Sequence, residues 1–423
     1  MTISRLSWLN SNNSTMSKIY LDNNASTPVD QQVLQAVIQS LSQHMGNPSS
    51  IHSFGRETRQ GITRARSQVA DFLGVKAREI VFTSGGTEAV NAAIRGFCQA
   101  AIQGHSSELS QKGSLMHSPG HLSGCSPGHI ITTDLEHACM YQTLKEMQRC
   151  GWEVTFLSAG LWGAATPQAI KQALQPNTRL IALTAVNSET GVKTDIDEIA
   201  LIALHAQVPF VVDGVALLGK EAFIIPKGVS AMCFSGHKLH APKGIGAAFI
   251  RQTMRVAPLI TGGEQELGRR AGTENVSGIM GFAMAIDILT SALPSASQKM
   301  AMLRDRFEQG ILGALPEVWV NGQGARVVNT SNLAFSGIDG ESLLMLLDSS
   351  GVAASHGSAC SSGALEPSRV LLNMGLPMEL ARASLRFSFS RMNTVDEIDR
   401  AVLIVVKIVR QLREMRKKGL TAI

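Results

Sequence analysis

The residues of this 423-residue sequence best suited to chemistry are an acid, a lysine and a cysteine, each in a distinctive setting. Asp213 ends the apolar run 210–212, where a buried carboxylate needs a cationic partner or strong hydrogen bonds. Taken alone, it would be interpreted as a turn or helix-capping residue. Lys238 follows 25 residues later, in the segment Ser-Gly-His-Lys at 235–238. A lysine whose pKa is lowered by burial or a nearby cation can form a Schiff base with a carbonyl group.

The combination of Asp213 and Lys238 indicates a particular kind of cofactor site more specifically than either residue does alone. An acid at a strand end, followed by a Schiff-base lysine, is typical of a pyridoxal-phosphate (PLP) site, with the acid on the pyridine nitrogen. Residues 84–88 are Ser-Gly-Gly-Thr-Glu and lie between a predicted strand and a predicted helix. A strand, a glycine turn and a helix N-terminus together form an anion site, so this segment is suited to a phosphate group.

Cys360 stands among small polar residues, in Gly-Ser-Ala-Cys-Ser-Ser-Gly at 357–363, a composition that favours a mobile loop. A nucleophilic cysteine must be accessible and partly thiolate, which such a loop allows. The other five cysteines lie in predicted helices, strands or an insertion, where cysteine is usually a small buried hydrophobe. The sequence has no Cys-x-x-Cys pair, which argues against a disulfide framework and predicts a cytoplasmic protein.

These motifs resemble those of the cysteine desulfurases, the NifS/IscS type within the class V aminotransferase family. The resemblance covers about residues 19–410, and its most specific segments are 235–238, Pro-Lys-Gly-Ile-Gly at 242–246 and 357–363, with Leu-Glu-Pro-Ser at 365–368. It implies the PLP-dependent transferase fold type I, an α/β fold. The large domain of that fold has a mostly parallel seven-stranded sheet between helices, and its smaller C-terminal domain is α+β.

The resemblance also implies a role for each matching residue. Lys238 would bind the cofactor, His137 would stack on its ring and help proton transfer, and Cys360 would take the sulfur atom. Arg386 suits the substrate carboxylate because its planar guanidinium binds a carboxylate through two hydrogen bonds. The remaining cofactor-binding positions would be Gly86, Thr87, Asp213, Ser235, His237 and Thr273, the last reaching a neighbouring subunit, and the remaining substrate-binding positions Asn187 and Ser188.

The implied reaction converts L-cysteine to L-alanine and leaves a persulfide on Cys360, which passes to a sulfur acceptor such as an iron–sulfur scaffold protein. A shared phosphate site implies a homodimer. Ser188 and Ala216 depart from the family pattern, which has asparagine and glutamine there. Ala216 cannot donate a hydrogen bond to the cofactor, so turnover is expected to be slower by about one or two powers of ten. Three alternatives therefore stay open: a selenocysteine lyase, another PLP β-elimination enzyme, and a weakly active or non-catalytic sulfur-transfer scaffold.

Apolar runs alternate with helical patterns over most of the chain, which indicates a mostly parallel sheet that binds ligands beyond the carboxyl ends of its strands. The polar residues Glu136, Asn187 and Asp213 follow such runs. From about residue 290, long helices with fewer strands predict an α+β domain. The predicted strands are 18–22, 80–83, 130–133, 152–157, 180–186 and 210–212, and the first helices are 30–43 and 56–73.

We therefore predict a large PLP-binding domain and a small domain that carries Cys360. The predicted divisions are a disordered extension at 1–17, a segment at 18–29 that packs with the small domain, the large domain at 30–289 with a surface insertion at 103–128, and the small domain at 290–423.

Composition excludes several other classes of protein. The 38 basic and 33 acidic residues give no indication of nucleic-acid binding. No apolar run approaches the roughly 20 residues that span a bilayer, and the polar N-terminus lacks the pattern of a signal peptide. The histidines of the insertion show no repeated ligand spacing, so no metal is expected.

Overall fold

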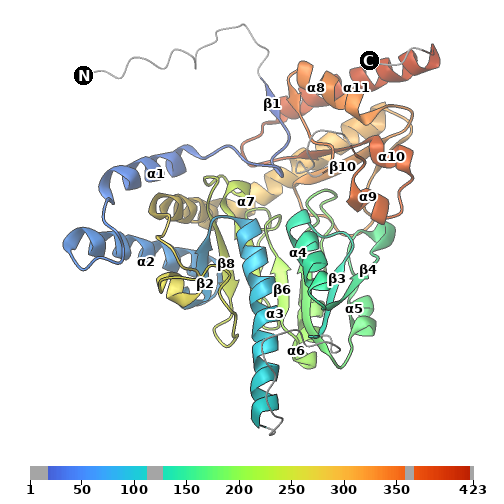
Figure 1. Ribbon diagram of the computed structural model, residues 1–423. Helices are drawn as coiled ribbons and strands as arrows, with labels where there is room; N and C mark the ends of the chain where they lie inside the picture. The colour runs from blue at the N-terminus through green and yellow to red at the C-terminus, as the bar shows by residue number, and fades with distance from the viewer. Residues whose placement is uncertain (1–17, 112–126, 358–365, 420–423) are drawn as a thin grey trace, which may run out of the picture.

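A seven-stranded sheet forms the centre of the larger part of the protein, whose computed structural model describes residues 18–111, 127–357 and 366–419 (Figure 1). The strand order is β2-β8-β7-β6-β5-β3-β4, and every neighbouring pair is parallel except the two pairs made by β8. The predicted α/β class with a mostly parallel sheet is therefore confirmed. The strands are β2 (Ile80–Thr83), β3 (His129–Thr133), β4 (Glu153–Leu157), β5 (Thr178–Thr184), β6 (Phe210–Asp213), β7 (Ala231–Ser235) and β8 (Gly246–Ile250).

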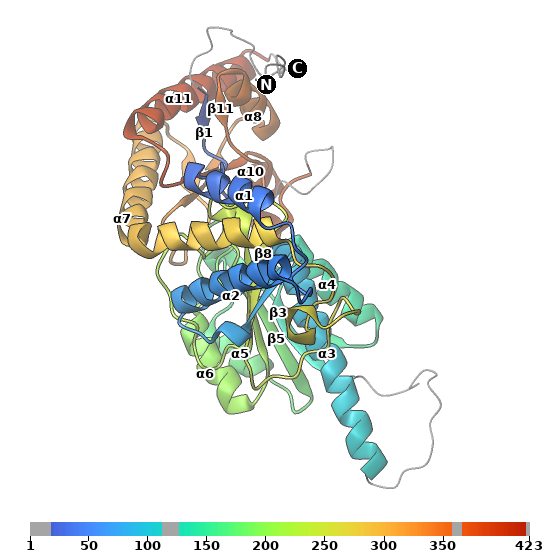
Figure 2. The ribbon, with the colours of Figure 1, turned by 90° about the vertical axis from the view of Figure 1, so that its left-hand side faces the viewer.

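Helices cover both faces of this sheet, which explains why its strands are almost continuously apolar (Figures 1 and 2). Alternate residues of a strand serve opposite faces, so Val211 packs toward α3 and α4 while Val212 packs toward the other layer. Figure 2 shows α1, α7 and α2 lying side by side in that layer. The helices of this part are α1 (Gln31–Gln43), α2 (Ser53–Leu73), α3 (Gly86–Gln111), α4 (Ala138–Arg149), α5 (Pro167–Ala173), α6 (Ile196–Ala206) and α7 (Val276–Ala314).

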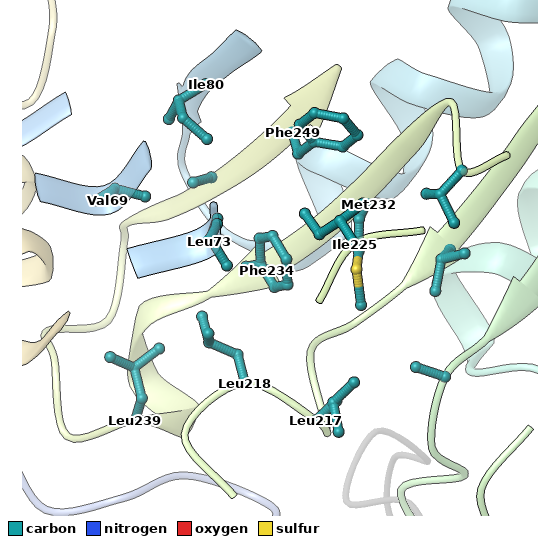
Figure 3. Close-up of a cluster of buried hydrophobic side chains, with 14 of the residues drawn as sticks. Val69, Leu73, Ile80, Leu217, Leu218, Ile225, Met232, Phe234, Leu239 and Phe249 are labelled. Carbon is teal, nitrogen blue, oxygen red and sulfur yellow. The ribbon is translucent and has the colours of Figure 1, made fainter. Parts of the chain in front are cut away.

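One hydrophobic cluster anchors the two chain segments that carry Asp213 and Lys238 (Figure 3). Phe234, on β7, is fully buried at its centre. Leu218 enters the cluster from the loop after β6, and Leu239 enters it directly after Lys238. Because interior side chains pack as densely as organic crystals, this shared core holds both segments in a fixed relation.

A second hydrophobic core surrounds a three-stranded antiparallel sheet of order β12-β10-β9. The N-terminal strand β1 (Ile19–Tyr20) lies beside this core and pairs in parallel with β11 (Val352–Ala353). Helix α7 runs without interruption through residue 289 and contributes to both cores, so the predicted division at 289/290 falls inside one helix. The other elements are β9 (Val318–Val320), β10 (Thr330–Phe335), β12 (Ser384–Ser388), α8 (Gly340–Ser349), α9 (Arg369–Asn373), α10 (Met378–Arg382) and α11 (Val395–Lys417).

The start predicted for the insertion at 103–128 is wrong, because α3 continues to Gln111. Residues 105–111 contain neither glycine nor proline, and a helix that has begun extends at little cost. Residues 1–17 and 112–126 lie outside the described residues. Strands β7 and β8 were not predicted from the sequence, because they contain only one β-branched residue between them and flank the glycine-rich segment of Lys238.

Helix α7 also contradicts the expectation that no apolar run reaches membrane-spanning length, because it is long and apolar enough to cross a bilayer. Half of its most apolar window is buried inside the protein. Phe282 belongs to the core of the large sheet and Phe307 to the second core. These contacts identify α7 as a core helix of this fold.

Candidate active site

A cavity of about 490 Å³ lies at the carboxyl ends of the parallel strands, where the large sheet meets residues of the second core. The described residues near it hold no group of three His, Cys, Asp or Glu side chains suited to a metal ion. Its wall brings together most of the predicted site residues: Gly86, Thr87, His137, Asn187, Ser188, Asp213, Ser235, His237, Lys238 and Arg386.

Two predicted site residues are not part of the described wall. Thr273 is exposed, in the loop before α7, and does not line the cavity of its own chain. Cys360 lies outside the described residues, although Gly357 and Glu366, which flank that segment, both line the cavity. The roles of both residues stay predictions.

Asp213 is a buried acid at the end of β6. Its Oδ1 accepts a hydrogen bond of 3.0 Å from the backbone N–H of Val215. Burial raises the pKa of this carboxyl group, and the nearby charges of His137 and Lys238 oppose that rise. A protonated pyridine nitrogen would supply the strong cationic partner that a buried carboxylate requires.

Lys238 lies on the one-turn helix Gly236–Lys238, directly after β7. Its Nζ donates hydrogen bonds to the backbone carbonyl oxygens of Asn24 and Ala25, the latter at 3.0 Å. The amine is therefore held in the cavity wall by the N-terminal segment of the chain, more than 200 residues away in sequence.

His137 caps α4, and its ring faces Cys139. Its Nδ1 accepts a hydrogen bond of 3.2 Å from the Cys139 backbone N–H and lies 3.0 Å from the Cys139 sulfur. An accepting Nδ1 places the proton of the neutral ring on Nε2. Burial raises the pKa of the Cys139 thiol, so this residue stays a thiol at neutral pH. Sequence reasoning treated Cys139 as an ordinary buried cysteine, whereas it lines the cavity.

The N-terminus of α3 forms a cradle suited to a phosphate group. A Cβ atom on Gly86 would lie 2.6 Å from a methyl group of Val215, so only glycine fits there. The Nδ1 of His237 is buried and has no hydrogen-bond partner in the described part of the chain. Burial and the charge of Lys238 lower the pKa of His237 to about 4, so its ring is neutral. With Asp213 and Lys238, these residues fit a PLP cofactor.

Arg386 lies on β12 and is only 2% exposed. One terminal nitrogen of its guanidinium pairs with Asp22 at 2.8 Å, and the other donates to the carbonyl oxygen of Ser188 at 3.1 Å. Its Nε is buried and has no partner among the described residues. This unused donor, in a buried cationic group, fits a substrate carboxylate.

Asn187 lines the cavity, but its side chain mainly shapes the turn after β5. Its Oδ1 accepts from the backbone N–H groups of Glu189 and Thr190, and its Nδ2 donates to the carbonyl oxygen of Leu135. Its predicted contact with the substrate therefore stays a prediction. Ala216 also lines the cavity, with a methyl group that cannot donate a hydrogen bond.

Glu136 and Lys220 are buried in the cavity wall, and sequence reasoning assigned neither of them a role. The carboxylate of Glu136 accepts hydrogen bonds from Thr133 Oγ1 at 2.6 Å and from the Thr184 N–H at 2.8 Å. Burial raises the pKa of Glu136 to about 8, and Asp213 shifts it in the same direction. The sequence signals for Glu136 are its position after an apolar run and directly before His137.

Glu136→Gln is expected to stabilise the PLP-free protein at pH 8 and to change its stability little near pH 4.5. The folded-state pKa of about 8 exceeds the ordinary value of 4.5, so the stability that Glu136 contributes is full below pH 4.5 and is lost as pH rises through 8. Glutamine avoids this loss: its Oε1 can accept from the Thr184 N–H while its Nε2 donates to Thr133 Oγ1, as the protonated carboxyl group would. Thermal unfolding at pH 5 and pH 8 tests the prediction, with the exposed Glu153→Gln as control. An equal change in Tm at both pH values would contradict it.

Comparisons with known proteins identify the family of the chain. The sequence profile of the aminotransferase class-V family matches residues 19–111 and 123–401. The chain therefore belongs to the aminotransferase class-V family. Its motifs resemble those of the cysteine desulfurases in this family, which use PLP.

Individual proteins similar to this chain are named cysteine desulfurases or have NifS-like structures. "Cysteine desulfurase 2" of Trichormus variabilis is 43% identical over 94% of both chains. "Cysteine desulfurase IscS" of Methanosarcina thermophila is 39% identical and covers 94% of this chain and 93% of its own. A solved NifS-like protein superposes with a TM-score of 0.81 at 30% identity, over 93% of this chain and all of its own. A structure of SspA in complex with cysteine has a TM-score of 0.74 at 29% identity, over 89% of this chain and all of its own.

Proposed function

We propose that this chain is a PLP-dependent cysteine desulfurase, which converts L-cysteine to L-alanine and transfers the sulfur atom to Cys360. The observation that carries the proposal is the meeting of Asp213, Lys238, His137 and Arg386 around one cavity. The cysteine desulfurases that resemble the chain over more than nine-tenths of its length support the same activity.

Each of these side chains has a separate role in the proposed reaction. The bound cofactor supplies an electron sink that stabilises negative charge at the substrate α-carbon. Asp213 keeps the pyridine nitrogen protonated, and Arg386 binds the substrate carboxylate and thereby orients the Cα–H bond. We assign removal of the α-proton to Lys238 and a hydrogen bond within the cavity to the Nε2–H of His137, and the position of both residues in the cavity wall supports these roles.

Sulfur transfer requires a second thiol, which we assign to Cys360. The Cys360 thiolate attacks the substrate sulfur, an S–S bond forms, and the Cβ–S bond breaks. The β-carbon keeps the bonding electron pair and takes a proton, which yields alanine and a persulfide on Cys360. A thiolate suits this step because it is the nucleophilic form of cysteine.

We further propose that two copies form a homodimer in which Thr273 reaches the partner's phosphate site. The loop that carries Thr273 supports this, because it exposes the apolar side chains of Leu259, Ile260 and Leu267. Leu267 also has a left-handed φ of +61°, which is strained for leucine. Exposed apolar groups close to a strained loop are typical of a surface that binds a partner.

The cytoplasm is the proposed location, and an iron–sulfur scaffold protein is the proposed acceptor of the sulfur. Both proposals rest on the resemblance of the motifs and on the chemistry of a reactive thiol, which needs a reducing compartment. The same proposal assigns the large domain to cofactor binding and the small domain to the Cys360 segment.

Product analysis distinguishes this function from its alternatives. Under reducing conditions, the cofactor-loaded protein is expected to release alanine and sulfide from L-cysteine in equal amounts and to release no pyruvate. Without reductant, mass spectrometry is expected to find one additional sulfur atom on the peptide that contains Cys360. Pyruvate and ammonia in place of alanine would indicate β-elimination, and activity confined to L-selenocysteine would indicate a lyase. A colourless protein that does not bind PLP would favour the scaffold alternative.

A further inference from the structure

Lys220 is a buried lysine of the cavity wall that the mechanism above does not use. It is 2% exposed and lies in the loop after β6, seven residues beyond Asp213. Its Nζ donates a hydrogen bond of 2.9 Å to the backbone carbonyl oxygen of Lys238. The hydroxyl group of Ser297, on α7, donates to the carbonyl oxygen of Lys220, so the segment is held at both ends of this residue.

The ionic surroundings of Lys220 are positive or neutral. Lys238 and Arg391 are its charged neighbours, and burial together with their charges lowers the pKa of Lys220 to about 7. His240 is neutral, because burial and the charge of Lys220 lower its pKa to about 4. Asp30 is occupied by Arg391 at 2.5 Å. No carboxylate in the described part of the chain forms an ion pair with Lys220.

This arrangement is unfavourable for a purely structural residue. A buried ammonium group without an acid loses hydration, and the single hydrogen bond to the Lys238 carbonyl oxygen replaces only part of it. A neutral donor such as glutamine would hold the carbonyl oxygen of Lys238 equally well. The charged form of Lys220 therefore calls for an explanation in the cavity, where the charged neighbour that lowers its pKa most is the proposed cofactor-binding lysine.

We propose that Lys220 is a positioning residue for Lys238: it fixes the backbone of Lys238, and its charge favours the unprotonated form of the Lys238 nitrogen. The inference rests on the assignment of Lys238 under the proposed function. Asp213 acts on the amine in the opposite direction. The other ionisable groups of the described cavity wall are Glu136, His137, Cys139, Glu189, His237, His356, Glu366, Arg369 and Arg386.

An unprotonated nitrogen at Lys238 has a defined use in the reaction. An amino acid arrives with a protonated amino group, and its nitrogen must lose one proton before it can react as a nucleophile. With PLP held by Lys238, an unprotonated Lys238 nitrogen would accept that proton, and no other acid or base would be needed. By favouring the unprotonated Lys238 nitrogen, Lys220 allows the site to accept a substrate whose amino group is protonated.

The test is a pH titration of the absorbance of the cofactor-loaded protein, which reports the proton on the nitrogen that links Lys238 to PLP. Lys220→Met is expected to raise the midpoint by about one pH unit or more, a tenfold gain in proton affinity. Lys220→Gln keeps a donor for the Lys238 carbonyl oxygen and replaces the methionine variant if that variant does not fold. The same rise of the midpoint is expected for it. Lys220→Arg keeps the charge and should stay within about 0.3 unit of the parent.

A matched control is Lys227→Met, which removes an exposed positive charge seven residues after Lys220 and should leave the midpoint unchanged because solvent screens it. A midpoint in the Lys220→Met or Lys220→Gln protein equal to that of the parent would overturn the inference. The titration needs no turnover, so it is independent of desulfuration. Borohydride reduction followed by peptide mapping identifies the cofactor-bound lysine, and a lysine other than 238 would overturn the assignment under the proposed function instead.

Discussion

Lys238→Ala is expected to lower kcat for alanine formation by at least about four powers of ten, because the variant loses both the cofactor-binding amine and the group that moves the α-proton. The cavity itself should persist, since Leu239 and Phe234 anchor the surrounding segment in the core. The carbonyl oxygens of Asn24 and Ala25 lose their donor, so a modest loss of stability is also expected.

Two measurements test this variant together: alanine formation from L-cysteine, and exchange of the substrate α-hydrogen with deuterium in D₂O. Both should fall to background in Lys238→Ala. The exposed Lys243→Ala serves as the control for loss of a lysine in the same segment and should retain both activities. Retention of more than a few per cent of α-hydrogen exchange in Lys238→Ala would show that another base takes the proton.

Cys360→Ser is expected to lower sulfide release by at least about three powers of ten while α-hydrogen exchange continues. A serine hydroxyl stays protonated at neutral pH and is a poor nucleophile toward sulfur, whereas Lys238, Asp213 and Arg386 are unchanged. The variant should therefore separate the two halves of the reaction, in contrast to Lys238→Ala, which stops both.

The control for this variant is Cys150→Ser, which removes an exposed cysteine at the end of α4. It should release alanine and sulfide at the parent rate. Parent-like sulfide release from Cys360→Ser would refute the assignment of Cys360. Cys139 would then be the thiol to test next, because it lines the cavity beside His137.

The sequence predicted the parts of the site that local patterns encode. Asp213 follows a short buried strand and Lys238 lies in a glycine-rich segment, so both were recognisable, and both line the cavity. The parallel sheet was also predictable, because runs buried on both faces are continuously apolar. Strands β7 and β8 were missed because they contain a single β-branched residue between them, whereas the shorter β2 is rich in isoleucine and valine and the shorter β6 in valine.

The other parts of the site depend on contacts between distant segments. Nothing in the local sequence around Lys220 indicates that its ammonium group meets the carbonyl oxygen of Lys238. The environment of Glu136 likewise depends on β5, which supplies the N–H of Thr184. Burial and hydrogen bonds between distant segments shift the pKa of such groups from its ordinary value. A pattern of residues along the sequence does not contain these contacts, so it cannot predict the shift.

The contacts of the N-terminal segment have a consequence for the order in which the protein matures. Asp22 pairs with Arg386, 364 residues later in the chain, and Asn24 and Ala25 hold Lys238. During synthesis the N-terminal segment emerges early, but its pairing with Arg386 must wait for almost the whole chain. Contacts of such long sequence separation form late, because loop closure must come before they gain energy. The part of the site that we assign to the substrate carboxylate is therefore completed only after almost the whole chain has been made.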